Sequence, residues 1–247
     1  MLYNFTENHV IPGGRFSTLY DQMSKQTHLL IAGRTGSGKS TVVNGIIHSQ
    51  LVQKSCKEEQ FILIDPKRVE LSQWKTAPHC ISYSSDDKSD RVHSLLMADD
   101  IIADRFRYME SKGLRKYDGG SVHIVIDELA DMLTTQKEAV LPLLQHIGQV
   151  GRAANVLLIC CTQCPTAQIL STQLRCNFTS ILGLRTRSAQ DSRNIIGMKG
   201  CEMLPEYGKG YYITPRFEGI VNLPLISEAE LQRVAEHWSN RRNYVAS

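Results

Sequence analysis

The chain has 247 residues, of which 42% are hydrophobic and 21% are charged, and its formal net charge at pH 7 is +3. This composition excludes a disordered or fibrous protein, and the length allows one large α/β domain or two small ones. The net charge is too small to predict a nucleic-acid partner by itself. No apolar run reaches the roughly 18 residues that cross a bilayer, and the start lacks a secretory pattern, so we expect a cytoplasmic protein.

Predicted strands and helices alternate along nearly the whole chain. Residues 1–27 are polar and mixed and suggest a lead-in, and the apolar run 28–32 predicts a strand before a glycine-rich loop and a helix over 42–51. Ser227 with Glu230 three residues later is a capping box that opens a last helix. The other predicted strands are 61–65, 81–84, 122–127, 156–162, 179–184 and a hairpin of 210–214 with 218–223; the other predicted helices are 89–109 and 140–150, with Pro142 in the first turn of the latter.

The strand pattern predicts the fold class. The apolar strands are nearly continuous rather than alternating, which indicates that both faces of the sheet are covered. We therefore expect an α/β fold, a three-layer domain with a mostly parallel central sheet. The expected organisation is a lead-in over 1–27, a core domain over 28–226 and a C-terminal helix over 227–247.

The loop after the first strand matches the phosphate-binding pattern G-x-x-x-x-G-K-[ST] in full. Its glycines let backbone N–H groups surround phosphates, while Lys39 reaches the β and γ phosphates and the Ser40 hydroxyl binds Mg²⁺. A strand precedes the loop and a helix follows it, as this pattern requires. The expected nucleotide-binding residues are Gly33, Arg34, Thr35, Gly36, Ser37, Gly38, Lys39, Ser40 and Thr41.

A second set of candidate residues follows two later strands. The strand 122–127 places Asp127 at the carboxyl edge of the sheet, where it can hold Mg²⁺, and Glu128 is a candidate general base for the attacking water. The alternative is an acidic pair at a helix start, near the positive end of the dipole. Gln163 follows the strand 156–162 and can contact the γ phosphate or the water, although it can equally be an ordinary loop residue.

The seven cysteines suggest a reducing compartment. Cys160 and Cys161 are adjacent on a predicted strand, so their side chains should point to opposite faces. Cys161 and Cys164 have C-x-x-C spacing, but no second pair accompanies them for a zinc site. We expect small buried side chains rather than a redox or metal centre.

Several longer segments resemble the FtsK/SpoIIIE DNA translocases. They are LIDPKRVEL (63–71) with PHC (78–80), GRAANVLLICCTQCP (151–165), RSAQDSRNIIG (187–197) and the segment from GYYITP (210–215) to VAEHW (234–238). Their order and spacing agree with that family from about residue 11 to residue 240. The resemblance implies a RecA-like P-loop ATPase that uses ATP and Mg²⁺, forms a hexameric ring and moves double-stranded DNA.

The resemblance also assigns roles to basic residues. Arg152 matches an arginine that reaches the neighbouring subunit's γ phosphate, although an arginine at a helix end can also simply neutralise carbonyl groups. Arg193 in the DSR motif is a second candidate for sensing a neighbouring nucleotide. Lys67 in the DPK motif either braces the site or faces the ring pore.

A basic cluster is the candidate DNA contact. It lies at the end of a predicted long helix and in the loop after it, with Tyr108 and Tyr117 interleaved, and the matching region of the family leads into a pore loop. The alternative is a solvated helix end. Arg185 and Arg187 are next in line for this role. The expected DNA-binding residues are Arg105, Arg107, Lys112, Arg115 and Lys116.

The sequence departs from the family pattern at Cys164, where the family has an arginine. We also expect a minimal motor for a plasmid, phage or conjugative element, without the DNA-reading domain or membrane segment of the large translocases. Two rival functions stay open: a related ATPase that acts on protein cargo in type VII secretion, and a non-hydrolysing adaptor. The intact Lys39, Asp127 and Glu128 argue against the adaptor.

Overall fold

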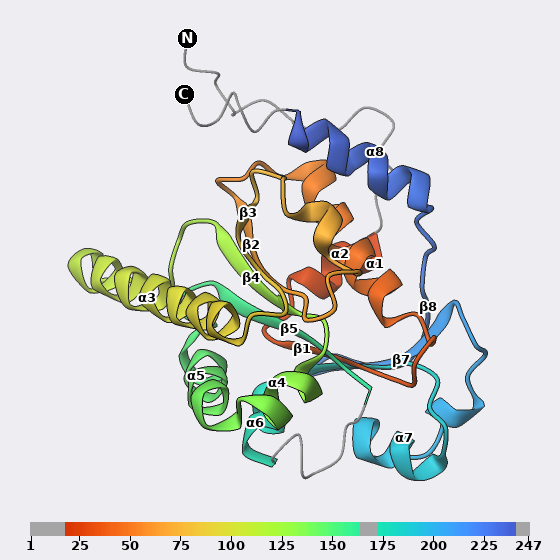
Figure 1. Ribbon diagram of the computed structural model, residues 1–247. Helices are drawn as coiled ribbons and strands as arrows, with labels where there is room; N and C mark the ends of the chain where they lie inside the picture. The colour runs from red at the N-terminus through yellow and green to blue at the C-terminus, as the bar shows by residue number, and fades with distance from the viewer. Residues whose placement is uncertain (1–17, 164–171, 241–247) are drawn as a thin grey trace.

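The computed structural model describes residues 18–163 and 172–240 and has one central sheet (Figure 1). The strand order is β3-β2-β4-β5-β1-β6-β7-β8. The first six strands in this order pair in parallel, and β7 and β8 form an antiparallel hairpin at one side. The strands are β1 (Leu29–Ala32), β2 (Glu59–Ile64), β3 (Cys80–Ser84), β4 (Ser121–Ile126), β5 (Val156–Thr162), β6 (Ser180–Gly183), β7 (Lys209–Thr214) and β8 (Phe217–Asn222).

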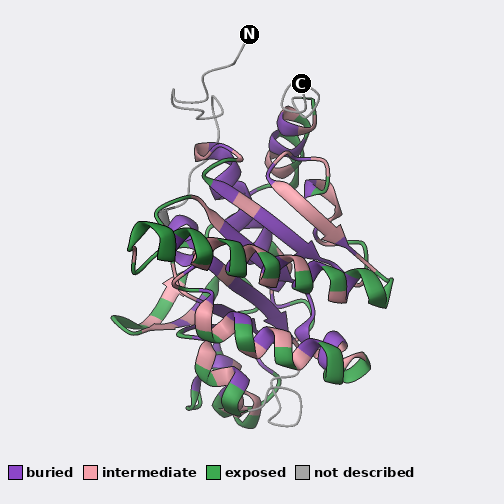
Figure 2. Ribbon diagram, turned by 90° about the vertical axis from the view of Figure 1, so that its left-hand side faces the viewer, coloured by how far each residue is buried: buried purple, intermediate pink, exposed green. Residues whose placement is uncertain are grey.

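Helices cover both faces of the sheet (Figure 1). One layer contains α1, α2 and α8, and the other contains α3, α4, α5 and α6, while α7 packs beside β6. Their inner faces and the strands β1, β2, β4, β5 and β6 are mostly buried, whereas β8 and the outer face of α3 are largely exposed (Figure 2). The helices are α1 (Thr18–Ser24), α2 (Lys39–Gln53), α3 (Lys88–Lys112), α4 (Leu129–Thr135), α5 (Lys137–Val150), α6 (Thr172–Asn177), α7 (Ala189–Ile196) and α8 (Glu228–Ser239), with short 3₁₀ helices η1 (Ser72–Trp74) and η2 (Cys201–Met203).

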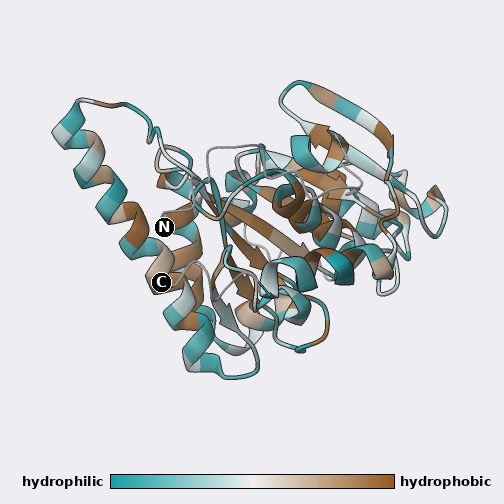
Figure 3. Cartoon of the chain, turned by 90° about the horizontal axis from the view of Figure 1, so that it is seen from above, coloured by the Kyte–Doolittle hydropathy of each residue, from teal (hydrophilic) through white to brown (hydrophobic). Residues whose placement is uncertain are grey.

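Successive strand residues enter different hydrophobic cores. Leu29 packs into the core under α2, whereas Leu30 packs into the core under α3 and α5. Cys160 and Cys161 divide in the same way, which confirms the prediction that they point to opposite faces. Seen from above, the hydrophobic colour gathers on the central strands and on the helix faces that meet them (Figure 3). The predicted three-layer α/β fold with a mostly parallel sheet is confirmed.

Some helix limits differ from the prediction. α5 begins at Lys137, so Pro142 lies in its second turn, and the prediction of a first-turn proline was wrong. The helix starts earlier because Lys137, Glu138 and Ala139 favour helix without contributing to the apolar periodicity. The short helices α1, α4, α6 and α7 were not predicted. α1 lies within the expected lead-in, and its Tyr20 packs so closely on α2 that a Cβ at Gly45 would lie 2.3 Å from the ring.

Helix caps follow the local sequence closely. The Ser227 hydroxyl accepts a hydrogen bond from the Glu230 N–H, as the capping pattern predicts. Asp87 caps the start of α3 in the same way, by accepting from the Ser89 N–H. Of the helices in residues 18–163 and 172–240, not one combines the length and the apolar character that a bilayer crossing requires.

The parallel strands give the sheet two distinct ends. We call the end where β1, β2, β4 and β5 finish the carboxyl edge, and the end where they begin the amino edge. The glycine-rich loop, Asp127, Glu128 and Gln163 follow strands and lie at the carboxyl edge. The C-terminal end of α3, the loop 113–120 and the turn 151–155 precede strands and lie at the amino edge.

Candidate nucleotide site

The glycine-rich loop joins β1 to α2 at the carboxyl edge. Gly36 and Gly38 have φ angles of 75° and 94°, in the left-handed region that favours glycine. The Gly33 N–H donates to the Thr162 carbonyl at 3.3 Å, and the Arg34 N–H donates to the Arg185 carbonyl at 2.9 Å. The loop is therefore tied to the ends of β5 and β6, in front of the α2 N-terminus, where anions bind favourably.

Lys39 is held inside this loop. Its Nζ donates to the carbonyl oxygens of Gly33 and Arg34, each at 2.9 Å. Burial lowers the pKa of Lys39, and the nearby Glu128 and Asp127 carboxylates oppose that change. The loop carbonyls thus hold the ammonium group where a phosphate cradled by the loop would meet it.

Asp127 is buried at the end of β4 among other acidic groups. Its residue exposure is 7%. Burial raises the pKa of Asp127 from 3.8 to about 6, and the charges of Asp65, Glu70 and Glu128 add to the increase, while Lys67 opposes it. A cation beside Asp127 would relieve this excess of negative charge.

The donors around Asp127 fit Mg²⁺. Ser40 and Asp127 line the same pocket. Within the described part of the chain, no group of three or more His, Cys, Asp or Glu side chains is arranged to hold a metal ion. Mg²⁺ is usually bound by one or two protein oxygens together with water and substrate phosphates, so a hydroxyl and one carboxylate are sufficient.

Gln163 connects the loop to Glu128. The Thr35 hydroxyl donates to Gln163 Oε1 at 2.7 Å, and the Gln163 N–H donates to Glu128 Oε1 at 3.3 Å. Glu128 lies at the start of α4, which agrees with the alternative interpretation of Asp127 and Glu128 as an acidic pair at a helix start. However, the Glu128 side chain does not cap that helix. Its carboxylate instead faces the residue that touches the phosphate-binding loop.

Two adjoining pockets open beside the loop. The first encloses about 380 Å³ and is lined by the loop with Lys67, Glu70, Asp127 and Gln163. The second encloses about 400 Å³ and is mostly apolar. Tyr207 lines both pockets, and its segment is tied to the loop because Arg34 pairs with Glu206 at 2.6 Å. The sequence analysis missed the apolar pocket, whose principal side chains are Tyr20, Val42, Tyr207, Leu223 and Leu225.

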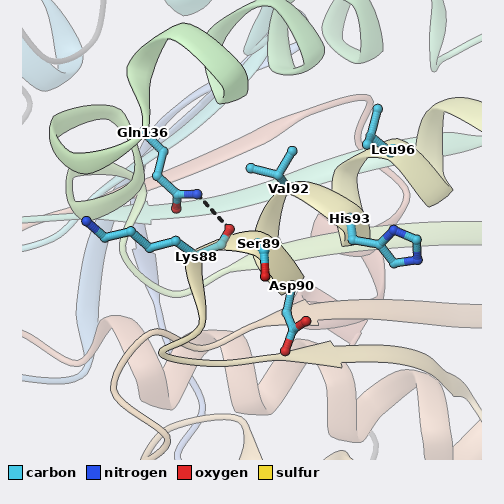
Figure 4. A pocket seen from close by; sticks show the side chains of 7 residues that line it. All are labelled: Lys88, Ser89, Asp90, Val92, His93, Leu96 and Gln136. Carbon is cyan, nitrogen blue, oxygen red and sulfur yellow. Dashed lines mark hydrogen bonds between the residues drawn. The ribbon is translucent and has the colours of Figure 1, made fainter.

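A larger pocket of about 540 Å³ lies elsewhere, between the start of α3 and Gln136 (Figure 4). The Gln136 amide donates to the Lys88 carbonyl at 2.6 Å at one end, and His93 and Leu96 stand at the other end. It contains neither a glycine-rich loop nor a pair of adjacent carboxylates. The chemistry that the sequence predicts is therefore in the smaller pocket.

Arg152 lies at the amino edge of the sheet, whereas the glycine-rich loop lies at the carboxyl edge. It is exposed and follows the end of α5. Burial lowers the pKa of His28, which precedes β1, to about 4, and the charge of Arg152 contributes to this decrease. Arg193 is exposed at the last turn of α7. Within one chain, Arg152 and Lys39 thus lie at opposite edges of the sheet, and the contact of Arg152 with the γ phosphate of a neighbouring subunit stays a prediction.

The basic cluster also lies at the amino edge. Arg107, Lys112, Arg115 and Lys116 are exposed, and Arg107 pairs with Asp104. Arg105 differs from them, because its guanidinium group donates to the carbonyls of residues 154 and 155 at 2.7 and 3.1 Å. A contact with DNA by this cluster therefore depends on the four exposed side chains. Cys164, the departure from the family pattern, lies outside the described residues.

Comparison with known proteins supports the resemblance. The model of the FtsK/SpoIIIE family matches residues 8–123. A curated relative is the DNA translocase FtsK of Pseudomonas syringae pv. tomato, with 30% identity over an alignment of 260 residues. The alignment covers 89% of this chain and 32% of that protein. The chain spans about a third of the length of the curated relatives it matches.

Solved structures share the fold at lower identity. The pCW3 conjugation coupling protein TcpA, determined with ATPγS, has a TM-score of 0.76 at 17% identity, covering 91% of this chain and 66% of that chain. The cytoplasmic domain of the Thermomonospora curvata type VII secretion ATPase EccC has a TM-score of 0.71 at 21% identity, covering 86% of this chain and 28% of that chain. The chain therefore shares the α/β fold of these two proteins.

Proposed function

Because the chain resembles the FtsK/SpoIIIE family in sequence and shares its fold with the coupling protein TcpA, we propose that it is an ATP-driven DNA translocase. It hydrolyses ATP at the interfaces of a ring of subunits and moves double-stranded DNA, for example for a plasmid, a phage or a conjugative element. The observation that carries this proposal is the bonded arrangement of the loop, Gln163 and Glu128 beside Lys39 and Asp127. These are the parts that a water-activating phosphoryl transfer requires.

Each of these residues has a distinct task in hydrolysis. The amides of the loop and Lys39 hold the β and γ phosphates, and Ser40 with Asp127 would hold Mg²⁺, which neutralises charge on the phosphate oxygens. Glu128 accepts the proton of the attacking water. Gln163 contacts both Thr35 of the loop and Glu128, and it would respond to the presence or absence of the γ phosphate beside them.

The apolar pocket fits the base of the nucleotide. It shares Gly38, Thr41 and Tyr207 with the phosphate pocket, so a ligand that fills both runs from charged to apolar surroundings. Tyr207 and Leu225 are 66% and 76% exposed, although they line this pocket. Large exposed apolar side chains at the mouth of a site are typical of a surface that a partner covers, and a neighbouring subunit would cover them here.

The location of Arg152 supports a ring. At the amino edge it cannot serve the nucleotide at the carboxyl edge of the same subunit, and no hydrogen bond or ion pair holds its guanidinium group among the described residues. In a head-to-tail ring the amino-edge surface of one subunit meets the nucleotide of the next. Arg152 would then stabilise the transition state of its neighbour. Six subunits are the number that the family resemblance implies.

The four exposed basic residues at the amino edge would contact the DNA backbone. Phosphate contacts require mobile cations along the path of the duplex, and aromatic side chains between them are compatible with that role. Tyr108 and Tyr117 pack edge to face at 5.7 Å within the cluster. Under this proposal DNA and the nucleotide bind at opposite edges of the sheet, and binding of one would be transmitted to the other through the domain.

An ATPase assay with and without duplex DNA tests the proposal. We expect hydrolysis that depends on Mg²⁺ and is stimulated by duplex DNA. Hydrolysis without stimulation by any nucleic acid would favour a protein cargo instead. Absence of hydrolysis, with ATP still bound, would favour the adaptor and contradict the proposed enzyme.

A further inference from the structure

Two amino-edge segments are bonded to each other more closely than their separation in sequence suggests. The turn 151–155 offers the carbonyls of Ala153, Ala154 and Asn155 in succession. The Tyr117 N–H donates to the first at 2.8 Å, and Arg105 donates to the second and third at 2.7 and 3.1 Å. All three bonds come from the end of α3 and the loop 113–120, the region that carries the basic cluster.

Asn155, in the turn, also donates hydrogen bonds to the loop 113–120. Its side-chain amide donates to the carbonyls of Tyr117 at 3.1 Å and Gly119 at 3.2 Å. Its φ angle is 53°, in the left-handed region that asparagine tolerates better than most residues. Arg105 completes the contact by lying over the Tyr117 ring, with Cζ 4.3 Å from the ring centroid. The loop and the turn therefore hold each other from both sides.

Arg152 lies inside this bonded turn. The Asn155 N–H donates to the Arg152 carbonyl at 3.4 Å, and the Val156 N–H donates to the Gly151 carbonyl at 2.8 Å. Gly151 has no room for a side chain, since a Cβ would lie 2.3 Å from the Val156 carbonyl oxygen. Arg152 therefore belongs to the same bonded unit as the loop 113–120.

We propose that Asn155 is a positioning residue that couples DNA held by Arg115 and Lys116 to the placement of Arg152 in the neighbouring subunit's site. This inference rests on the proposed function. Phosphate contacts restrain the loop 113–120, and the bonds from Asn155 and Tyr117 transmit that restraint to the turn. DNA binding then raises the fraction of subunits in which Arg152 is correctly placed, and hydrolysis accelerates.

A purely structural role for these bonds predicts a different result. The same contacts close the chain before β4 and β5, because the Val122 N–H also donates to the Asn155 carbonyl. If they only stabilise the fold, their loss lowers hydrolysis equally with and without DNA. A coupling role lowers the stimulation by DNA itself, so the ratio of the two rates separates the two roles.

The test uses two substitutions of Asn155 in the full chain. Asn155→Gly keeps the left-handed backbone and removes the two amide bonds. Asn155→Asp keeps the shape of the side chain but turns the donor into an acceptor that faces two carbonyls. We expect saturating stimulation by a duplex to fall by about 2- to 30-fold, as for residues along a coupling path. The duplex concentration for half-maximal stimulation should change little.

Lys116→Ala is the matched control, because it removes a phosphate contact and leaves the bonded turn in place. It should raise the duplex concentration needed for stimulation. In an Arg152→Ala background, Asn155→Asp should cause no further loss, because the two residues act in series. Thermal unfolding and ATP binding verify that each variant is folded. If Asn155→Asp does not fold, the result for Asn155→Gly decides the test.

The outcomes separate this inference from the proposed function. If duplex DNA stimulates wild type and both Asn155 variants equally, the inference is overturned and the proposed translocase function is unaffected. An equal loss of basal and stimulated rates would also overturn it, in favour of a structural role. If no duplex stimulates the wild type, the proposed function fails and the inference fails with it.

Discussion

Each edge of the parallel sheet buries a carboxylate, and the pKa values of the two groups move in opposite directions. At the carboxyl edge, burial raises the pKa of Asp127 to about 6, and further carboxylates increase it. At the amino edge, Glu59 is completely buried, and burial alone would raise its pKa as well. His123 at 2.6 Å and Lys54 at 2.7 Å outweigh that effect, so the pKa of Glu59 is lowered.

The opposite pKa shifts of Asp127 and Glu59 indicate which buried carboxylate has a functional role and which has a structural one. The charge on Glu59 is paired within the chain, as in a structural site. The charge on Asp127 is crowded by like charges, as in sites built for an external cation or a proton transfer. The amino edge instead keeps its candidate functional groups on the surface, where Arg152 and the basic cluster can reach other molecules.

The largest expected effect tests whether the two edges meet between subunits. Arg152→Ala should bind ATP normally and lose about 10³- to 10⁵-fold in turnover, because charge stabilisation by an arginine from a neighbour is lost. Mixing it with Glu128→Gln subunits should restore activity, since some interfaces pair an intact Arg152 with an intact Glu128. The measurement is the ATPase rate against mixing ratio, with assembly followed by sedimentation. A flat curve in rings that demonstrably mix would exclude Arg152 and favour Arg193.

The next effect concerns the carboxyl edge alone. Glu128→Gln should slow hydrolysis by about 10²- to 10⁴-fold, the contribution of a positioned base, while ATP and Mg²⁺ still bind. Lys39→Ala should instead weaken ATP binding. Single-turnover rates and nucleotide titration separate the two defects. Wild-type turnover by Glu128→Gln would mean that the base is another residue.

The buried carboxylates themselves provide a stability test. Glu59→Gln should lower the free energy of unfolding by about 1–3 kcal/mol, because the half-buried Lys54 loses its counter-charge and the buried His123 ring loses its carboxylate partner. Asp127→Asn should leave stability unchanged or higher, since it removes a crowded charge, yet abolish Mg²⁺-dependent hydrolysis. Denaturant titrations give both values. Glu58→Gln, an exposed neighbour of Glu59, is the control and should have little effect.

The pH dependence of this test follows from the direction of the Glu59 shift. The folded pKa lies below the ordinary value of 4.5. The stabilisation from Glu59 is therefore present above that pH and is lost as the pH falls through the folded pKa. Wild type and Glu59→Gln should converge in stability in acid. A difference between them that stays constant down to pH 2 would contradict the paired charge.

The exposed basic residues give a smaller effect, on DNA alone. Changing Lys112, Arg115 and Lys116 together to Ala should weaken duplex binding and flatten its salt dependence, because fewer counterions are released. Removing three phosphate contacts should make the slope of log affinity against log salt concentration shallower by about 2.7. Between 50 and 200 mM salt, the loss of affinity should therefore be about 40-fold smaller for the triple variant than for wild type. Fluorescence anisotropy measures the slope, and ATP binding verifies the fold. An unchanged slope would move the contact to Arg185 and Arg187.

Local patterns predicted the carboxyl edge well and the amino edge poorly. The phosphate-binding loop is one continuous motif, and Asp127 and Glu128 follow an apolar strand, so short-range sequence places them. The task of Arg105 depends on carbonyls 49 and 50 residues away, which no local pattern contains. The role of Tyr207 could not be predicted from local sequence either, because its pocket forms only when α1, α2 and the segments around β7 and β8 come together. Such contacts are set by tertiary packing rather than by spacing.

The smallest expected effect concerns the pocket that the sequence did not reveal. Tyr207 stands between the charged pocket and the apolar pocket, and it is 66% exposed in the isolated subunit. Loss of an aromatic surface that stacks on a base costs about 1 kcal/mol at the low end of the known range, which corresponds to about a 5-fold weaker affinity. Tyr207→Ala should therefore weaken ATP binding by about that factor, while Tyr207→Phe, which keeps the ring, should bind like wild type.

Inorganic triphosphate distinguishes a base contact from a general disturbance of the site. It lacks a base, so Tyr207→Ala should bind it as wild type does, whereas Lys39→Ala should bind both ligands poorly. Calorimetric titration of the two ligands against the three variants measures this pattern. Equal weakening of ATP and triphosphate by Tyr207→Ala would show that the side chain acts on the phosphate-binding loop, through the neighbouring Glu206–Arg34 pair, rather than on the base.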